Sequence, residues 1–300
     1  MARTIRISSV QLPAVLPGRN RREKNAANLR SLRKLLRVAG DRHSDLALLG
    51  EYANLWHHGT SESRREYAAD PIPGPITKAV CTLAKKYRMN IALPMLGTFE
   101  GVKGSYVVLI DRRGSIAGAY LKSHPIEAEQ QMGMAAGSSL PVFQLDCARV
   151  GVMTCMDIEY PEVAQVLMLE GAQLLLFPHV QAGWGEPDWE IRYRARAIDT
   201  GLYLASACYG YPEGEWSPGK MLGRSGVVGP DGTILADAGR RVGVITRDID
   251  LDERRITHFF FTTSHPRADA VKASRRPELY TPLTDPRITR KALKVLKGKR

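Results

Sequence analysis

Three residues with reactive or ionisable side chains each follow an apolar, strand-like run of the sequence. They are Glu51 after Leu46–Leu49, Lys122 after Ile116–Leu121, and Cys155 after Val150–Thr154. Strand ends are where α/β proteins place reactive groups on a rigid edge. A carboxylate, an ammonium and a thiol are together the groups that a covalent, cysteine-based reaction needs. These three residues are therefore the first candidates for an active site.

Cys155 stands at an expected strand-to-helix turn, between Gly-Val-Met-Thr and Met-Asp-Ile-Glu-Tyr-Pro-Glu. At such a turn a backbone N–H, for example that of Met156, could face an oxyanion that develops on a substrate. A nearby ammonium favours the thiolate, which is the nucleophilic form of cysteine. A carboxylate held away from water could accept and return a proton. The residue types thus indicate nucleophilic catalysis.

Each residue also has an ordinary structural interpretation. A lone cysteine on a strand is more often a small buried hydrophobic residue, and Cys81, Cys147 and Cys208 are interpreted in that way. A single lysine after a strand is usually solvated, and a glutamate there is often a cap or an ion-pair partner. The order and surroundings of all three residues favour the chemical interpretation.

Strand and helix patterns alternate along the chain. The expected strands are Ile5–Leu12, Leu46–Leu49, Asn90–Leu96, Ser105–Asp111, Ile116–Leu121, Val142–Leu145, Val150–Thr154, Leu174–Pro178 and Leu202–Cys208. The expected helices are Asn25–Val38, Pro75–Tyr87, Pro161–Glu170 and Trp189–Thr200. Three last strands, Arg224–Val228, Thr233–Asp237 and Val242–Asp250, are expected to form a meander around the turn Pro230-Asp231-Gly232. This alternation predicts an α/β fold with helices covering two sheets packed face to face.

The composition is that of an ordinary globular protein, with 44% hydrophobic and 25% charged residues. No apolar run approaches the ~18 residues that would cross a bilayer. The first residues lack the apolar stretch of a signal peptide, so we expect a cytoplasmic protein. Four cysteines without a C-x-x-C pair favour reduced thiols and argue against a cysteine zinc site. We expect neither a metal nor an organic cofactor.

The net charge of +12 is unevenly distributed. Residues 287–300 contain seven basic and no acidic side chains, which leaves +5 for the rest of the chain. A basic tail suggests nucleic acid or another acidic partner. No aromatic residues or nucleic-acid motif accompany this one, so we expect a solubilising or flexible end and no membrane association. The predicted organisation is one domain, 1–284, followed by a basic tail, 285–300.

Three segments, Asp45–Glu51, Gly118–His124 and Gly151–Glu162, resemble motifs of the nitrilase (carbon–nitrogen hydrolase) superfamily. The first resembles the buried strand that leads into the catalytic glutamate, and the second resembles the segment with the catalytic lysine. The third resembles the nucleophile elbow, with Asp two places after Cys and a Pro-Glu that opens a helix. The resemblance runs from Ile5 to about Leu283.

The resemblance implies a four-layer αββα sandwich of the nitrilase type, with two mixed sheets face to face and helices outside. It implies a homodimer or higher homo-oligomer. It also implies that Cys155 is the nucleophile, Glu51 the acid/base and Lys122 the oxyanion partner.

Two positions depart from the family pattern, since Gly50 replaces the usual Pro and Leu121 the usual Arg. Neither supplies catalytic atoms, so we expect activity to survive both changes. Family members often use a second glutamate to orient the lysine. Glu127 and Glu129 compete for that place, and Glu129 fits the distance to Gly137 better.

The resemblance leaves the substrate open among amides, N-carbamoyl amines and nitriles. The run Cys-Met-Asp-Ile-Glu-Tyr-Pro-Glu is more similar to the amidase and carbamoylase branches than to the Cys-Trp-Glu run of true nitrilases. We therefore expect hydrolysis of an amide or N-carbamoyl amine through a thioester. Nitrile hydrolysis and a non-catalytic binding or scaffold role are the alternatives.

Residues just after strand ends are expected to line the substrate pocket, with ordinary loop packing as the equal alternative for each. They are Tyr52, Asn54, Trp56, His179, Gln181, Trp184 and Glu186. Met156 is expected to contact the substrate through its backbone N–H.

Overall fold

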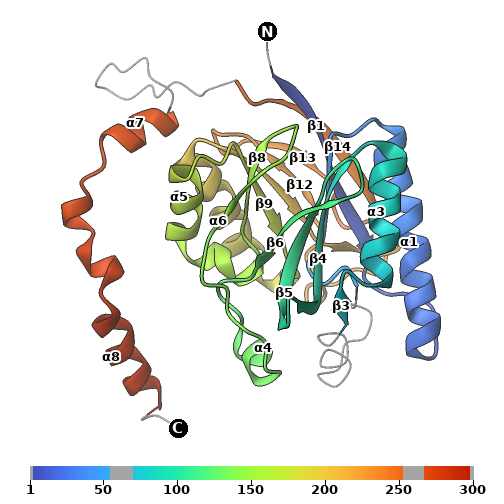
Figure 1. Ribbon diagram of the computed structural model, residues 1–300, viewed down its shortest axis with the longest axis horizontal. Coiled ribbons are helices and arrows are strands. Elements are labelled where there is room, and N and C mark those ends of the chain that lie inside the picture. Colours follow the sequence, from blue (N-terminus) through green and yellow to red (C-terminus); the bar gives the residue numbers. More distant parts are fainter. Residues whose placement is uncertain (1–2, 55–69, 253–266, 298–300) are drawn as a thin grey trace. The chain divides into compact units, whose positions relative to one another are not determined.

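The computed structural model describes residues 3–54, 70–252 and 267–297. Within them the strands form two sheets (Figure 1). The first sheet contains β1 (Thr4–Pro13), β2 (Leu46–Leu49), β3 (Pro71–Ile72), β4 (Asn90–Phe99), β5 (Val102–Ile110), β6 (Ile116–Leu121), β11 (Tyr209–Gly210) and β14 (Gly243–Asp250). The second contains β7 (Val142–Gln144), β8 (Arg149–Val152), β9 (Leu174–Pro178), β10 (Tyr203–Ala207), β12 (Gly226–Val228) and β13 (Ile234–Asp237). The first is ordered β11-β1-β2-β4-β5-β6, with β14 on β1 and β3 on β4, and the second β13-β12-β10-β9-β8-β7.

The central strands bury both of their faces. In β2, Leu46 and Leu48 pack with Leu176 of β9 in the apolar layer between the sheets. The alternate residue Leu49 belongs to a second cluster that includes Leu36 of a covering helix. A strand buried on both faces reads as a continuous apolar run, and the period of two distributes its residues between the two layers.

Helices cover the outer face of each sheet (Figure 1). α1 (Arg21–Asp41) and α3 (Pro75–Tyr87) lie on the first sheet, and α5 (Pro161–Leu169) and α6 (Glu186–Thr200) lie on the second. The order helix, sheet, sheet, helix confirms the predicted αββα sandwich. Helix α1 begins earlier than predicted because the side chain of Asn20 accepts a hydrogen bond from the Glu23 N–H and caps the helix.

The predicted three-strand meander is wrong in its last strand. β12 and β13 pair as expected, but β14 leaves them and pairs antiparallel with β1 in the other sheet, from Thr4 opposite Asp250 to Gln11 opposite Gly243. β1 is ten residues long and β13 only four. Pairing with β1 therefore satisfies more of the backbone N–H and C=O groups of β14 than pairing with β13 could.

The chain divides into two compact units, Met1–Arg255 and Ile256–Arg300. The described residues of the second unit form α7 (Arg267–Ala273), the 3₁₀ turns η4 (Pro277–Leu279) and η5 (Thr281–Thr284), and α8 (Pro286–Lys297). The predicted boundary at residue 284 stays a prediction, as do the homo-oligomer and the cytoplasmic location. No helix in the described ranges combines the length and apolar character needed to cross a membrane.

Strands β2, β6 and β8 each end just before one of the three candidate residues. β2 is parallel to β4, and β4, β5 and β6 follow one another antiparallel, so β2 and β6 run in the same direction. Glu51 and Lys122 therefore leave the first sheet at the same end. Cys155 follows β8 of the second sheet and opens the 3₁₀ helix η2 (Cys155–Glu159).

Candidate active site

Glu51, Lys122 and Glu129 form a buried cluster of three charged side chains. The ammonium Nζ of Lys122 lies 2.9 Å from Oε1 of Glu51 and 2.9 Å from Oε2 of Glu129. The exposed fractions are 1% for the lysine side chain, 0% for Glu51 and 1% for Glu129. Two strand ends and the short helix α4 (Glu127–Gln131) thus bring two carboxylates onto one ammonium, away from water.

The contact to Lys122 distinguishes between the two competing glutamates. Glu129 meets the ammonium through Oε2, which also accepts a hydrogen bond at 2.8 Å from the Ile126 N–H. Its other oxygen accepts a hydrogen bond from the hydroxyl of Tyr52. Glu127 is exposed and accepts from the side chain of Gln131 at 3.2 Å. The structure therefore places Glu129, and not Glu127, against the lysine.

Cys155 adopts a positive φ of 48°, a left-handed conformation that is uncommon for residues other than glycine. Such strain is typical of positions whose backbone is held by a functional turn. Cys155 is half-buried. It lies close enough to Glu51 and Lys122 for both charges to act on its thiol.

Burial and the charge of Glu51 raise the pKa of the Cys155 thiol well above its ordinary value. The ammonium of Lys122 and the backbone N–H of Val180 oppose this rise but do not overcome it. Lys122 thus favours the thiolate, as expected, but the low-dielectric surroundings and the nearby carboxylate outweigh its effect on the pKa. A thiol whose pKa is raised needs a base to become the nucleophilic thiolate.

Glu51 is the carboxylate placed to be that base. Burial raises its pKa, Lys122 lowers it and Glu129 raises it, and the net pKa lies above the ordinary glutamate value. Its Oε2 atom has no hydrogen-bond partner within the described residues. Burial lowers the pKa of Lys122, but the negative charges of Glu51 and Glu129 outweigh that effect and raise it. The lysine consequently stays an ammonium.

Asp157 connects the turn that contains Cys155 to the segment around Lys122 through hydrogen bonds. This buried carboxylate accepts from the Thr154 N–H at 2.8 Å and from the hydroxyl of Tyr120 at 2.7 Å. It also accepts from the backbone N–H of His124 at 3.1 Å and lies 2.8 Å from the Nδ1 atom of that ring. The residues flanking Lys122 and those flanking Cys155 are thus fixed relative to one another by one side chain.

A family profile described as carbon–nitrogen hydrolase matches residues 6–258, which is more than half of the chain. The chain belongs to the carbon–nitrogen hydrolase family. The predicted membership of the nitrilase superfamily is thereby confirmed.

Known carbon–nitrogen hydrolases resemble this one along most of their length. A probable nitrilase of Schizosaccharomyces pombe is 30% identical over 224 residues, which cover 71% of this chain and 76% of the relative. The omega-amidase NIT2 of Xenopus tropicalis is 30% identical over 237 residues, covering 75% and 83%. The structure of a cysteine-to-alanine mutant of the Nesterenkonia AN1 amidase aligns with a TM-score of 0.73 at 23% identity, covering 93% of this chain and 97% of that one. At that identity the structural likeness supports the fold alone.

Two residues predicted to line the pocket of this carbon–nitrogen hydrolase are engaged by protein groups. Tyr52 is buried and donates its hydroxyl to Glu129, so it supports the cluster. Asn54 donates to the Leu96 carbonyl at 2.8 Å and accepts from the Leu96 N–H at 3.0 Å. Its amide therefore fastens two chain segments together.

The remaining pocket residues differ in exposure. His179 is fully buried and stacked on Phe177, with ring centroids 4.8 Å apart, and burial lowers its pKa to about 3. Trp184, in the 3₁₀ turn η3 (Gly183–Gly185), is 75% exposed. Met156 and Gln181 are half-buried. Glu186 binds Arg224 and Arg240, and Trp56 lies outside the described residues. A substrate contact for any of them stays a prediction.

The backbone of Val180 is a part of the site that sequence reasoning missed. Its N–H acts on the sulfur of Cys155, and its side chain packs against an apolar group formed by Tyr52, Leu96, Met132 and Met134. A backbone donor leaves no residue-type signal, so only its place two residues after β9 could have suggested it.

Proposed function

We propose that this chain hydrolyses the C–N bond of a small amide or N-carbamoyl amine through a thioester on Cys155. The observation that carries the proposal is the Lys122 ammonium, held at 2.9 Å from two buried carboxylates beside a thiol. Removing charges from water costs several kcal/mol per ion, and the cluster has one more carboxylate than ammonium. Clusters with such perturbed pKa values gather at catalytic sites.

In the first half of the reaction, Oε2 of Glu51 takes the thiol proton as the sulfur of Cys155 attacks the carbonyl carbon. The oxyanion that forms is stabilised by the Lys122 ammonium and the Met156 N–H. Glu51 then gives the proton to the departing nitrogen. Ammonia or an amine leaves, and the acyl group stays on the sulfur as a thioester.

In the second half, water replaces the amine. Glu51 accepts a proton from the water, whose oxygen attacks the thioester carbon. Collapse of the second tetrahedral intermediate releases the acid, and the proton returns to the sulfur. One amide and one water give one acid and one amine, so the cycle needs no other reactant.

The names of the relatives support an amide as the first substrate class to test. The Xenopus relative is an omega-amidase, whereas the Schizosaccharomyces relative is named a probable nitrilase. Nitrile hydrolysis is therefore the second candidate.

The decisive experiment measures ammonia release from primary amides, N-carbamoyl amino acids and nitriles. The wild type is compared with Cys155→Ala and with the control Cys81→Ala, which changes a half-buried cysteine on α3. We expect release from the amide or carbamoyl group, lost by about 10³-fold or more in Cys155→Ala and retained in the control. An acyl adduct on the wild-type protein, detected by mass spectrometry, would support the thioester.

Three results would change the proposal. Release from nitriles alone would favour the second candidate. Equal activity of Cys155→Ala and wild type would show that another group is the nucleophile. If the folded wild type releases no ammonia from any of the three substrate classes, the non-catalytic alternative is favoured.

A further inference from the structure

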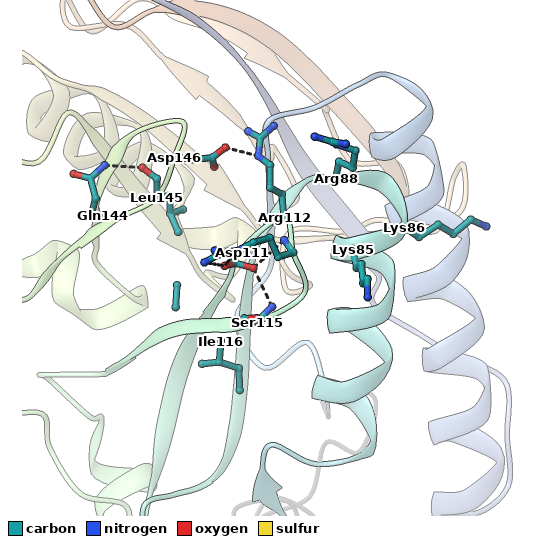
Figure 2. A pocket seen from close by; sticks show the side chains of 12 residues that line it. Lys85, Lys86, Arg88, Asp111, Arg112, Ser115, Ile116, Gln144, Leu145 and Asp146 are labelled. Atoms are coloured by element: carbon teal, nitrogen blue, oxygen red, sulfur yellow. Dashed lines mark hydrogen bonds and ion pairs between the residues drawn. The ribbon is translucent and has the colours of Figure 1, made fainter.

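A cavity of about 1000 Å³ lies beside the first residues of strand β6, at the opposite end of that strand from Lys122 (Figure 2). It is lined by the end of α3, the β5–β6 turn and the β7–β8 turn. Strand β6 begins at Ile116 in the cavity wall and ends just before Lys122. At about 3.3 Å per residue, the two sites are roughly 17–20 Å apart along this strand. The cavity is therefore separate from the candidate active site, and its volume suits a small molecule.

The acidic residues in the cavity wall are already paired with arginines. Arg112 lies 2.5 Å from Asp146 and 3.3 Å from Asp45, and Arg113 lies 2.9 Å from Asp111. Figure 2 shows the contact between Arg112 and Asp146 across the cavity from α3. These pairs leave little negative charge in the wall for a further cation.

The cations on the α3 side are not neutralised in this way. Lys85, Lys86 and Arg88 are exposed, and no ion pair joins them to an acidic residue in the described part of the chain. In Figure 2 Lys86 points away from the other labelled side chains, and its ammonium lies 5.1 Å from the ring centroid of Tyr87. Lys85 and Arg88 are therefore the cations best placed to meet a ligand.

Arg88 occupies an unusual backbone position for its residue type. It caps α3 in the left-handed conformation, with φ 51°, where glycine or asparagine is normally favoured. An arginine in this conformation carries a backbone cost that glycine would avoid. Its guanidinium is thereby presented beyond the last turn of the helix, beside the cavity.

The cavity wall also has an apolar part. Leu145 is buried, Ile116 is half-buried, and Ala117 of β6 is exposed. Lysine and arginine side chains bind phosphate and carboxylate groups, and an apolar wall accepts the hydrocarbon or aromatic part of the same molecule. The combination suits a ligand with two or more negative charges attached to an apolar group.

We propose that this cavity is a second ligand site, which binds a small organic polyanion of the phosphate or carboxylate type through Lys85 and Arg88. Two probes distinguish the sources of charge, namely ADP for phosphates and benzene-1,3,5-tricarboxylate for carboxylates. Adenosine lacks the charge and pyrophosphate lacks the apolar part. We expect at least one of the two polyanions to bind in calorimetric titrations more tightly than adenosine and pyrophosphate, and more weakly as salt is added.

A pair of charge-reversed double variants tests the location. Lys85→Glu/Arg88→Glu should weaken binding of the polyanion by at least about tenfold. Arg33→Glu/Lys34→Glu makes the same change in net charge at exposed positions of α1 and should change binding by less than about twofold. The variant Cys155→Ala should bind the polyanion like the wild type, so this test is independent of the catalytic proposal.

The proposal is overturned if neither polyanion binds the wild type. It is also overturned if both double variants weaken binding equally, since that result would reflect net charge alone. Loss of binding in Cys155→Ala would place the ligand in the active site instead. Circular dichroism of both double variants confirms that their folds are intact.

Discussion

The two ends of strand β6 carry positive charge in opposite physical settings. Lys122, after one end, is 1% exposed and contacts two carboxylates. Lys85 and Arg88, near the other end, are exposed and lack an ion-pair partner among the described residues. Charges interact strongly in a dry site and shift each other's pKa values, whereas water and salt screen exposed charges. Burial therefore decides that one end can move protons while the other can only attract ions.

The largest expected effect comes from the same substitution at the two ends. Lys122→Met leaves Glu51 and Glu129 buried without their ammonium and should lower the free energy of unfolding by about 3–5 kcal/mol. Lys85→Met removes an exposed charge and should change it by less than about 0.5 kcal/mol. Urea unfolding of both variants measures the difference. Similar small losses in both would contradict the view that the Lys122 cluster is dry.

The pH dependence of activity also tests the burial of the active-site cluster, through the pKa of Glu51. Glu51 must be ionised to accept the thiol proton, and its pKa is raised by burial. The value of kcat/KM should therefore rise with pH through a midpoint above the ordinary glutamate value of about 4.3. Acidification through that midpoint protonates Glu51 and removes activity. A midpoint at or below the ordinary value would show that another group limits the acid side.

Tyr52→Phe should give the smallest effect. The substitution removes the hydroxyl that donates to Glu129 and leaves the ring in place. Losing a hydrogen bond to a buried carboxylate costs about 1–3 kcal/mol. We expect kcat to fall about tenfold with KM nearly unchanged, because the lysine is held less firmly.

Tyr193→Phe is the matched control for this substitution. The Tyr193 hydroxyl is also buried, but it faces the Leu204 carbonyl at 3.4 Å. This variant should lose stability without losing kcat. Equal falls in kcat for both tyrosine variants would mean that the effect is one of stability rather than of the cluster.

The sequence predicted the secondary structure correctly where the pattern depends only on neighbouring residues. Apolar runs such as Leu46–Leu49 and Leu174–Pro178 are strands at the predicted positions. The partner of β14 was predicted wrongly, because alternation shows that a segment is a strand but not which edge it joins. That choice depends on which long strand still has unpaired backbone groups, and here the strand is β1.

In the candidate site, too, the sequence predicted which residues are involved but not all of their contacts. Motif order pointed to Glu51, Lys122 and Cys155, and the structure brings them together. Asn54 also follows a strand end, yet its amide is used on the Leu96 backbone. Position after a strand thus identifies residues near the site without showing what each side chain contacts.

The sequence by itself determined the family, the apolar runs of the central strands and the order of the reactive residues, because these depend on residue type and spacing along the chain. Only the tertiary structure decided that Glu129 rather than Glu127 meets Lys122, and that burial raises the pKa of the Cys155 thiol. It also decided that a cationic cavity faces the other end of β6. These properties depend on distances and burial between segments far apart in the chain, and the electrostatic energy changes steeply with both.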